Sequence, residues 1–318
     1  ILKYTRNYYL IEQDEIVELT SDQVRITDIN GDEIHKELLT ATWDVEAAEK
    51  GGYPHFMIKE IHEQPAAITS TISPRIVNGL PSFDLKNIAD EAFSELRNIH
   101  IVACGTAMHA GMVGKYLIER LARIPVQVDI ASEFRYRDPI LSENDLVIII
   151  SQSGETADTL AALRLAKSRG AKTLALVNVV GSSIAREADD VLYTWAGPEI
   201  SVASTKAYSV QVALLYLIAI KFALSHQKIS DSTAKEYCAT LLQIPQSIEK
   251  ILEDDNDDCQ YLASQFQNAH SLFYIGRGLD YALAMEGSLK LKELSYIHSE
   301  AYAAGELKHG TISLITND

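Results

Sequence analysis

The stretch LVIIISQSGET, from Leu146 to Thr156, decides the fold of this chain. Its first five residues, Leu146 to Ile150, are all apolar, and the polar segment that starts at Ser151 opens a helical pattern running to Lys167. A short strand that is apolar on both faces is typical of a parallel sheet covered by helices on both sides. Open sheets of this kind bind ligands at the carboxyl ends of their strands, and the polar segment follows such an end.

Strands and helices alternate on either side of this stretch. The predicted strands are 99–103, 126–130, 173–177 and 191–195, and the predicted helices are 105–121, 204–225 and about 230–268. This alternation predicts an α/β fold with a doubly wound parallel sheet.

The same arrangement begins again near residue 272. An apolar strand at 272–275 is followed by a glycine turn and a helix at 282–296. Both helices contain a glycine about one and a half turns in, Gly111 and Gly287, and the two starts are about 171 residues apart. We expect a second copy of the same fold, in tandem with the first and truncated after its opening portion.

The N-terminal part has a different pattern. Residues 1–40 alternate apolar and polar side chains in β fashion, and Asn30-Gly31 is typical of a tight hairpin turn. Glycines and prolines break the next segment into short helical runs, at Gly51-Gly52, Pro54, Pro65 and Pro74. We predict four regions: a β-rich unit at 1–40, a linker with short helices at 41–80, the first α/β domain at 81–228, and connecting helices with the start of the second domain at 229–318.

Composition excludes several classes of protein. The formal charge of -16 argues against a nucleic-acid partner, because phosphate backbones are bound by clustered Lys and Arg. The most apolar stretch, Val210–Leu224, contains Lys221 and is shorter than the roughly 20 residues of a membrane span, so we expect a core helix and no membrane partner. The cysteines are few and widely spaced, which favours a reducing cytoplasm and predicts no metal site: Cys104, Cys238 and Cys259.

An acidic protein must hold an anion with local groups. The segment Ser151–Thr156 offers hydroxyls and a carboxamide beside a helix N-terminus, whose free N–H groups attract a phosphate. A second hydroxyl cluster, Ser201, Ser204 and Thr205, is predicted to line the same pocket, with Gly105-Thr106 as the opposite wall. The alternative is that these Ser and Thr residues are helix N-caps.

Three charged residues recur on one helical face. Glu286, Lys290 and Glu293 are spaced i, i+4 and i+7, which predicts either a solvated salt-bridge ladder or an acid–base cluster for moving a proton along a sugar. His309 follows in a glycine-bounded segment with Glu306 and Lys308, and His is the side chain that gives and takes protons near neutral pH.

At these residues the sequence resembles the glucosamine-6-phosphate synthase family, also called glutamine:fructose-6-phosphate amidotransferase. The resemblance spans nearly the whole chain and lies in Lys59–Pro65, Cys104–Thr106, Ser151–Thr156, Val202–Ala207, Glu286–Glu293 and Ser299–Gly310. Ser-Gln-Ser-Gly-Glu-Thr alone marks a sugar isomerase (SIS) domain, whereas Lys-Glu-Ile-His-Glu-Gln-Pro and Gly-Glu-Leu-Lys-His-Gly are more specific. The resemblance implies two tandem flavodoxin-like SIS domains, the second truncated, after the last strands of an Ntn-type glutaminase domain in residues 1–40.

The resemblance also implies a role for each matching residue. The substrate-binding residues would hold fructose 6-phosphate: Thr106, Ser151, Gln152, Ser153, Thr156, Val202 and Ser204. Glu293 would shuttle a proton between C1 and C2, Lys290 would assist at the neighbouring oxygen, and His309 would open the sugar ring. In the family this His comes from the other subunit, so we expect a homodimer, and the chemistry needs no metal or organic cofactor.

The implied reaction converts fructose 6-phosphate and glutamine-derived ammonia to glucosamine 6-phosphate, for hexosamine synthesis. Ala107 stands where many relatives have Ser, which removes one hydroxyl from the pocket. The family's cysteine nucleophile would precede Ile1 and its Schiff-base lysine would follow Asp318, so we expect the chain alone to be inactive. Two alternatives stay open, a non-catalytic module that senses a sugar phosphate and a fructosamine-phosphate deglycase; the β-rich N-terminal part argues against the deglycase.

Overall fold

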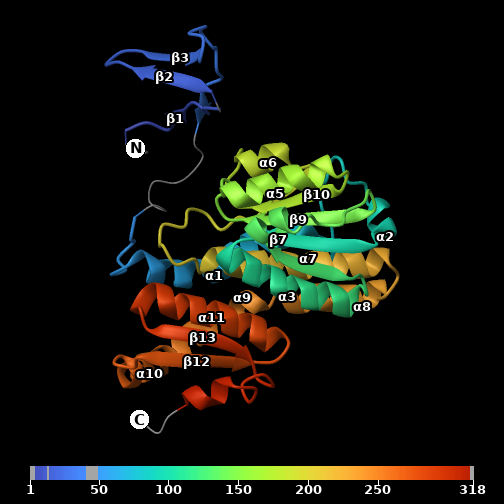
Figure 1. Cartoon of the computed structure of the whole chain (residues 1–318), viewed down its shortest axis with the longest axis vertical. Helices are drawn as coiled ribbons and strands as arrows, with labels where there is room; N and C mark the ends of the chain where they lie inside the picture. The colour runs from blue at the N-terminus through green and yellow to red at the C-terminus, as the bar shows by residue number, and fades with distance from the viewer. Residues whose placement is uncertain (1–3, 13, 41–48, 316–318) are drawn as a thin grey trace. The chain divides into compact units, whose positions relative to one another are not determined.

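The computed structural model describes residues 4–12, 14–40 and 49–315 (Figure 1). The chain forms two compact units, residues 1–53 and residues 54–318. We describe each unit by itself.

The first unit is built from short antiparallel strands. β1 (Asn7–Tyr8) pairs with β4 (Leu39–Thr40), and β2 (Glu15–Leu19) pairs with β3 (Val24–Asp28). Gly31 adopts a positive φ of 90° and donates its N–H to the carbonyl of Asp28, which confirms the predicted tight turn. The predicted alternation after this turn yields a single bridge between Thr27 and Glu33 and no strand of its own.

The second unit contains a five-stranded parallel sheet. The strands are β7 (Asn98–Ala103), β8 (Val126–Ile130), β9 (Asp145–Ser151), β10 (Lys172–Val177) and β11 (Asp190–Tyr193). Their order is β11-β10-β9-β7-β8, and every neighbouring pair is parallel. This order is that of flavodoxin-like sheets, so the predicted doubly wound α/β class is confirmed.

Helices cover both faces of this sheet (Figure 1). α3 (Gly105–Leu121) and α7 (Lys206–Ser225) cover one face, and α4 (Ala131–Tyr136), α5 (Ala157–Ser168) and α6 (Ser183–Glu187) cover the other. Alternate residues of β9 enter the two cores: Leu146, Ile148 and Ile150 face α3 and α7, whereas Val147 and Ile149 face α5. A strand with two buried faces favours apolar side chains on both, which explains the unbroken apolar run Leu146–Ile150.

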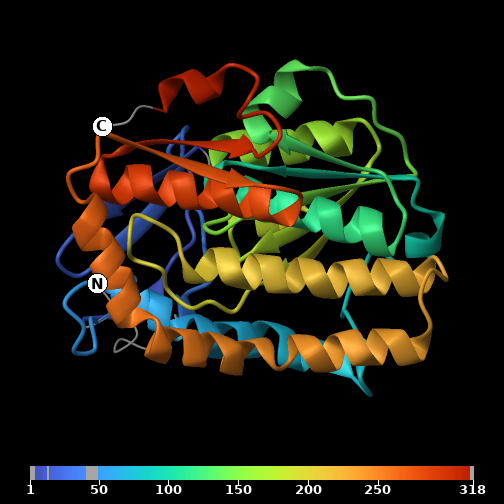
Figure 2. The same cartoon turned by 90° about the horizontal axis from the view of Figure 1, so that it is seen from below.

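The long apolar helix α7 lies in the core. By length and composition it is the one helix in the described part of the chain that could cross a membrane, but most of its residues are buried. Figure 2 shows it running beside α3 and α1 (Phe56–Ile72), and it contributes to the apolar clusters on both of its sides. The expectation of a core helix is confirmed.

The prediction that Pro65 breaks a helix is wrong. α1 continues through Pro65 over 17 residues. Proline lacks the N–H that would bond to the carbonyl four residues earlier, Ile61. The side-chain amide of Gln64 donates to that carbonyl at 2.9 Å instead, so the orphaned acceptor is satisfied and the helix persists.

The span predicted to be helical at about 230–268 forms three helices. These are α8 (Asp231–Leu241), α9 (Ile244–Asp254) and α10 (Asn256–Phe266). Pro245 stands in the first turn of α9, where its missing N–H costs nothing, and so separates α9 from α8. The remaining short elements are a 3-10 turn at Ser73–Arg75, the strand pair β5 (Ile76–Val77) and β6 (Leu80–Pro81), and α2 (Ala92–Glu95).

A second strand–helix module ends the described chain. β12 (Ser271–Gly276) is followed by α11 (Leu279–Ser295) and β13 (His298–Ala303), and the two strands pair in parallel. A short 3-10 turn at Thr311–Leu314 comes last. β13 was not predicted, because its sequence HSEAYA has no apolar run. The expected start of a second α/β fold is therefore present.

Candidate sugar-phosphate site

A cavity of about 220 Å³ opens at the carboxyl ends of β7 and β9. Three parts of the chain line it: Cys104, Thr106 and Ala107 at the start of α3; Ile150 to Ser153, Thr156 and Thr159 between β9 and α5; and Ser204 and Gln211 at the start of α7. β7 and β9 are direct neighbours in the sheet, so the two βα turns meet at one edge. The structure thus brings the polar segment together with Thr106 and Ser204, one residue from each of its predicted walls.

The segment Ser151–Thr156 is wound tightly by its own hydrogen bonds. The backbone N–H of Gly154 donates to Ser151 Oγ at 3.0 Å, and Ser151 Oγ lies 3.2 Å from Thr156 Oγ1. Gly154 has a φ of +69°, and a Cβ there would lie 2.0 Å from Ser182 Oγ. This turn therefore requires glycine.

The helix-cap alternative is wrong for Thr156 and Thr205, the two residues that stand at N-cap positions. Thr156 and Thr205 immediately precede α5 and α7, yet neither side chain accepts a hydrogen bond from its helix. Ser204 Oγ donates to Glu199. The hydroxyls of Thr156 and Ser204 border the cavity instead.

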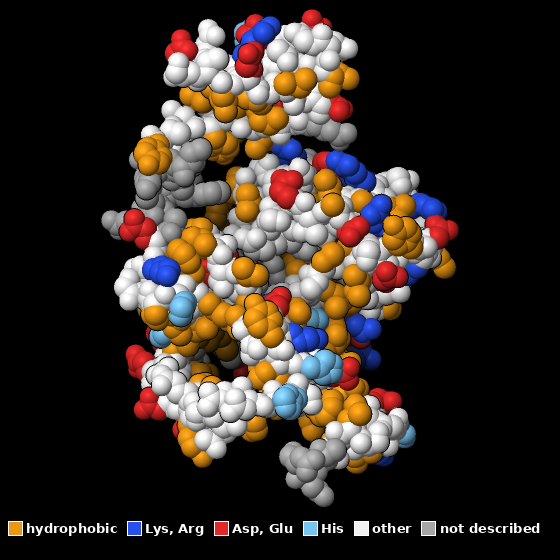
Figure 3. Space-filling view, turned by 60° about the vertical axis from the view of Figure 1, so that its left-hand side comes forward, with side chains coloured by type: hydrophobic (Ala, Val, Ile, Leu, Met, Phe, Trp, Pro, Cys, Tyr) orange, Lys and Arg blue, Asp and Glu red, His pale blue; other side chains and the backbone are white. Residues whose placement is uncertain are grey.

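The cavity offers neutral groups to a ligand. None of its lining residues is a Lys, Arg, Asp or Glu. On the face drawn in Figure 3, the described basic side chains are interspersed with acidic and apolar ones and form no continuous basic surface. An anion in this cavity would be held by hydroxyls, a carboxamide and backbone N–H groups rather than by a cationic clamp.

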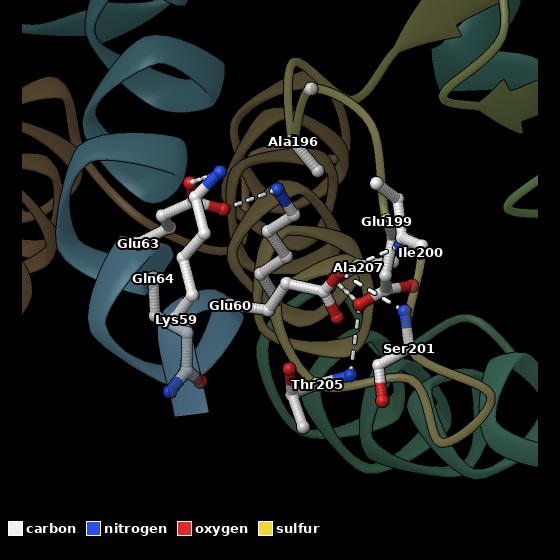
Figure 4. Close-up of polar contacts among 12 residues, drawn as sticks. Lys59, Glu60, Glu63, Gln64, Ala196, Glu199, Ile200, Ser201, Thr205 and Ala207 are labelled. Atoms are coloured by element: carbon white, nitrogen blue, oxygen red, sulfur yellow. Dashed lines mark hydrogen bonds and ion pairs between the residues drawn. The ribbon is translucent and has the colours of Figure 1, made fainter. Parts of the chain in front are cut away.

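The loop that carries Ser204 is held by two carboxylates (Figure 4). Glu199 accepts hydrogen bonds from the backbone N–H groups of Thr205 and Ala207 at 2.9 and 3.1 Å, and from Ser204 Oγ at 2.9 Å. Because these contacts surround Ser204, they fix its position at the cavity.

The second carboxylate, Glu60, comes from α1. It is 2% exposed and accepts from the backbone N–H groups of Ile200 and Ser201 at 2.6 and 3.1 Å. The ammonium of Lys206 lies 2.6 Å from Glu63, so α1 is joined to the start of α7 by a partly buried ion pair as well. These contacts give a structural reason for the Lys59–Pro65 motif.

Three residues of this loop lie outside the cavity: Ser201, Val202 and Thr205. Val202 is 97% exposed, and the prediction that Ser201 and Thr205 line the cavity is wrong. The contact of Val202 with a sugar stays a prediction.

The charged cluster on α11 reaches the cavity through Glu286. Lys290 Nζ lies 2.6 Å from Glu293 and 3.5 Å from Glu286. Glu286 is 5% exposed, accepts the hydroxyl proton of Thr106 at 3.0 Å and lies 2.7 Å from His109 Nδ1. Thr106 lines the cavity, so a continuous chain of contacts leads from the cavity wall to Glu293. The cluster is therefore no solvated ladder at its Glu286 end.

Tyr208 is also close to this cluster. Burial, together with the negative charge of Glu286, raises the pKa of Tyr208 to about 12. Its hydroxyl therefore stays protonated at neutral pH and remains a hydrogen-bond donor.

Glu293 and His309 do not line the cavity of their own chain. His309 is exposed in the turn after β13, and its ring makes no hydrogen bond or ion pair within the described residues. Among all the residues that the structure describes, no group of three or more His, Cys, Asp or Glu side chains is placed to hold a metal ion.

Sequence reasoning missed several residues around the cavity. Cys104, Thr159 and Gln211 line it, and Glu60, His109 and Glu199 support its walls. Glu60 belongs to the Lys59–Pro65 motif but was given no role at the site, and Gln211 stands in the middle of an apolar run. Neither position points to a site until the helices are packed.

Comparisons with known proteins agree with this geometry. A model of the SIS domain family matches residues 92–221 and 265–318. Proteins named glutamine–fructose-6-phosphate aminotransferase (isomerizing) are 59% identical in Caldanaerobacter subterraneus and 48% identical in Methanosarcina mazei; each match covers 99% of this chain and 52% or 51% of the relative. The chain thus spans about half the length of these curated relatives.

A solved structure extends the comparison to three dimensions. The C-terminal domain of glucosamine-fructose-6-phosphate aminotransferase from Francisella tularensis is 41% identical, with a TM-score of 0.80 over 85% of this chain and 78% of that one. By sequence and by fold, the chain therefore belongs to the SIS domain family, in the branch that includes this aminotransferase domain.

Proposed function

We propose that this chain carries the sugar-phosphate isomerase part of a glutamine–fructose-6-phosphate aminotransferase, which converts fructose 6-phosphate and glutamine-derived ammonia to glucosamine 6-phosphate. One observation carries the proposal: Thr106 borders the neutral cavity and also donates to Glu286 at 3.0 Å, the buried end of the acid–base cluster. The names of the relatives point to the same reaction.

The phosphate would bind to the segment Ser151–Thr156. The hydroxyls of Ser151, Ser153 and Thr156 and the amide of Gln152 can all donate to it, beside the N-terminus of α5. Thr106 is different, because its proton is engaged by Glu286. It presents lone pairs to the cavity, so its partner would be a sugar hydroxyl rather than a phosphate oxygen.

The proton transfer would be the work of Glu293. Lys290 lies between Glu286 and Glu293 and so orients the second carboxylate. A carboxylate that takes a proton from one carbon and returns it to the next performs an aldose–ketose isomerisation without a cofactor. Since His309 is exposed and lies outside its own cavity, we assign ring opening to His309 of a second copy in a homodimer.

The remaining assignments follow from charge and cysteine use. The acidic composition fits a protein with no nucleic-acid or membrane partner. Cys104, Cys238 and Cys259 are free thiols, which fits the cytoplasm.

A non-catalytic sugar-phosphate sensor is the second candidate. The observation in its favour is that neither Glu293 nor His309 lines the cavity of its own chain. Such a module would need the neutral cavity but not the cluster on α11.

Thermal unfolding with ligands tests the binding part of the proposal. A ligand that binds only the folded state at a hundredfold excess over its Kd stabilises it by about 2.7 kcal/mol. We expect fructose 6-phosphate and glucosamine 6-phosphate to raise the Tm of the 318-residue chain, and plain fructose to leave it unchanged. A shift with plain fructose, or with none of the three, contradicts the proposal.

Catalysis is tested in a chimaera in which this chain replaces the matching half of the Caldanaerobacter subterraneus relative. Glu293→Gln should still bind fructose 6-phosphate but form no glucosamine 6-phosphate, because the amide cannot accept the proton. Lys292→Met, at the neighbouring exposed position of α11, is the control and should keep its turnover. Normal turnover by Glu293→Gln would remove Glu293 from the mechanism and favour the sensor.

A further inference from the structure

Gln211 lines the cavity but has no hydrogen-bond partner. It lies in the second turn of α7 and is 2% exposed. Its Oε1 atom is closed off from solvent without a donor, and no hydrogen bond from its Nε2 is recorded in the described part of the chain. The oxygen end of this carboxamide is therefore buried and unpaired.

This state is unfavourable for the unliganded protein. A buried amide that has lost its water partners costs free energy unless it regains hydrogen bonds. The neighbouring polar groups of the cavity have protein partners: Thr106 bonds to Glu286, Ser151 to Gly154, and Ser204 to Glu199. Among the described residues that line the cavity, Gln211 has the one side-chain oxygen that is buried without a partner, which is what a group reserved for a ligand would show.

Gln211 stands on a different element from the phosphate segment. It comes from α7, whereas the donors for the anion come from the turn between β9 and α5. A carboxamide has one acceptor end and one donor end, and a half-turn of the amide exchanges them. Its oxygen would repel a phosphate dianion but can accept from a sugar hydroxyl, while its nitrogen can donate to a sugar oxygen.

We propose that Gln211 is a ligand-binding residue that recognises the hydroxyl-bearing carbon chain of the phosphosugar, and not its phosphate. The inference rests on the proposed function, because it takes the ligand of the cavity to be a hexose phosphate. It adds a specificity-determining contact from α7, a different element from the turn that would hold the anion.

The test exploits an unusual combination of effects in Gln211→Met. Methionine has a similar length and no polar atoms, so the variant removes the unpaired amide without opening a large cavity. Without ligand its Tm should stay the same or rise. By calorimetry, its affinity for fructose 6-phosphate should fall roughly tenfold, as expected for the loss of one or two hydrogen bonds. Its affinity for inorganic phosphate should change less than twofold.

Gln246→Met provides the matched control. Gln246 is exposed on α9 and does not line the cavity, so this variant should bind both ligands like the wild type. A second measurement uses the unaltered protein: the side-chain amide signals of Gln211 should move in NMR spectra on addition of fructose 6-phosphate and stay in place with inorganic phosphate alone.

Each other outcome has a defined meaning. Unchanged affinity for fructose 6-phosphate in Gln211→Met overturns the inference and leaves the proposed function intact. Equal weakening of both ligands, or a lower Tm with loss of both, also overturns it, because the amide would then serve the phosphate or the fold. If the wild-type chain binds no phosphorylated sugar, the proposed function and the inference fail together.

Discussion

The strand–helix module β7–α3 and the strand–helix module β12–α11 share a local design but differ in their surroundings. Each has a six-residue strand, a turn glycine with a φ near +55° and a 17-residue helix. Each helix also contains a glycine that faces its strand: a Cβ on Gly111 would lie 2.7 Å from Ile101, and one on Gly287 would lie 3.0 Å from Tyr274. The sequence repeat therefore marks the same close approach of helix and strand twice.

The two strands nevertheless differ in burial. Five of the six residues of β7 are buried, whereas in β12 only Gly276 is. β7 lies between β8 and β9, while β12 pairs with β13 alone among the described strands. The comparison shows that a local pattern fixes how a strand meets its helix, but that neighbouring strands decide how deeply the pair is buried.

The two strand–helix modules also differ in the chemical groups that they contribute. The first presents neutral groups to the cavity, and the second contributes the charges of Glu286, Lys290 and Glu293. Glu286 is the point where they meet. Three predictions test this comparison.

The largest effect is expected from Glu286→Leu, which breaks the junction. It leaves His109 buried without its carboxylate, and removing one partner of a buried pair costs about 3 kcal/mol of unfolding free energy. Urea unfolding measures the loss.

Glu249→Leu serves as the control for that variant, because Glu249 is exposed on α9 and should tolerate the change. Similar losses of unfolding free energy in the two variants would show that the contacts of Glu286 do not hold the two strand–helix modules together.

A smaller effect is expected from the paired glycine variants. In Gly111→Ala the new methyl group meets the fully buried Ile101, and we expect a net loss of about 2 kcal/mol from overpacking. In Gly287→Ala the neighbour is the ring of Tyr274, which is only partly buried and can shift. The gain in helix propensity should then bring the net change within about 0.5 kcal/mol of zero. Equal losses of unfolding free energy in the two glycine variants, measured by chemical denaturation, would contradict the difference in burial between the two strand–helix modules.

The smallest effect concerns acid sensitivity. Burial lowers the pKa of His100 in β7, opposed by the nearby charges of Asp145 and Asp129. The unfolded chain then binds a proton more readily than the folded one, so His100 makes stability fall as pH drops below about 6.5 and through the lowered pKa. The slope from this one group is at most about 1.4 kcal/mol per pH unit.

His100→Phe copies the residue at the matching position of β12, Phe273, and removes this titration. Between pH 7.5 and pH 5.5, the wild type should lose more unfolding free energy than the variant. Equal losses of unfolding free energy in the wild type and the variant would mean that His100 is not the acid-sensitive group of the β7–α3 module.

The sequence correctly predicted the features that depend on residues close together along the chain. The apolar run Leu146–Ile150 predicted a strand buried on both faces, and the glycine turns predicted where helices begin. The spacing of Glu286, Lys290 and Glu293 placed them on one face, because helical geometry is local. Prediction failed at β13 and at α1: the first has no apolar pattern, and the second continues through Pro65 because Gln64 satisfies the freed carbonyl.

The sequence by itself therefore determined the α/β class, the five strands of the parallel sheet in chain order and the polar segment Ser151–Thr156 that follows β9. Only the tertiary structure decided that Thr106 and Glu286, 180 residues apart, share a hydrogen bond, that Glu60 and Glu199 hold the loop of Ser204, and that Gln211 faces the cavity unpaired. The physical reason is the separation along the chain of the residues that interact. Turns and helix faces depend on a few adjacent residues, whereas the partners of a buried polar group depend on which distant elements pack against it.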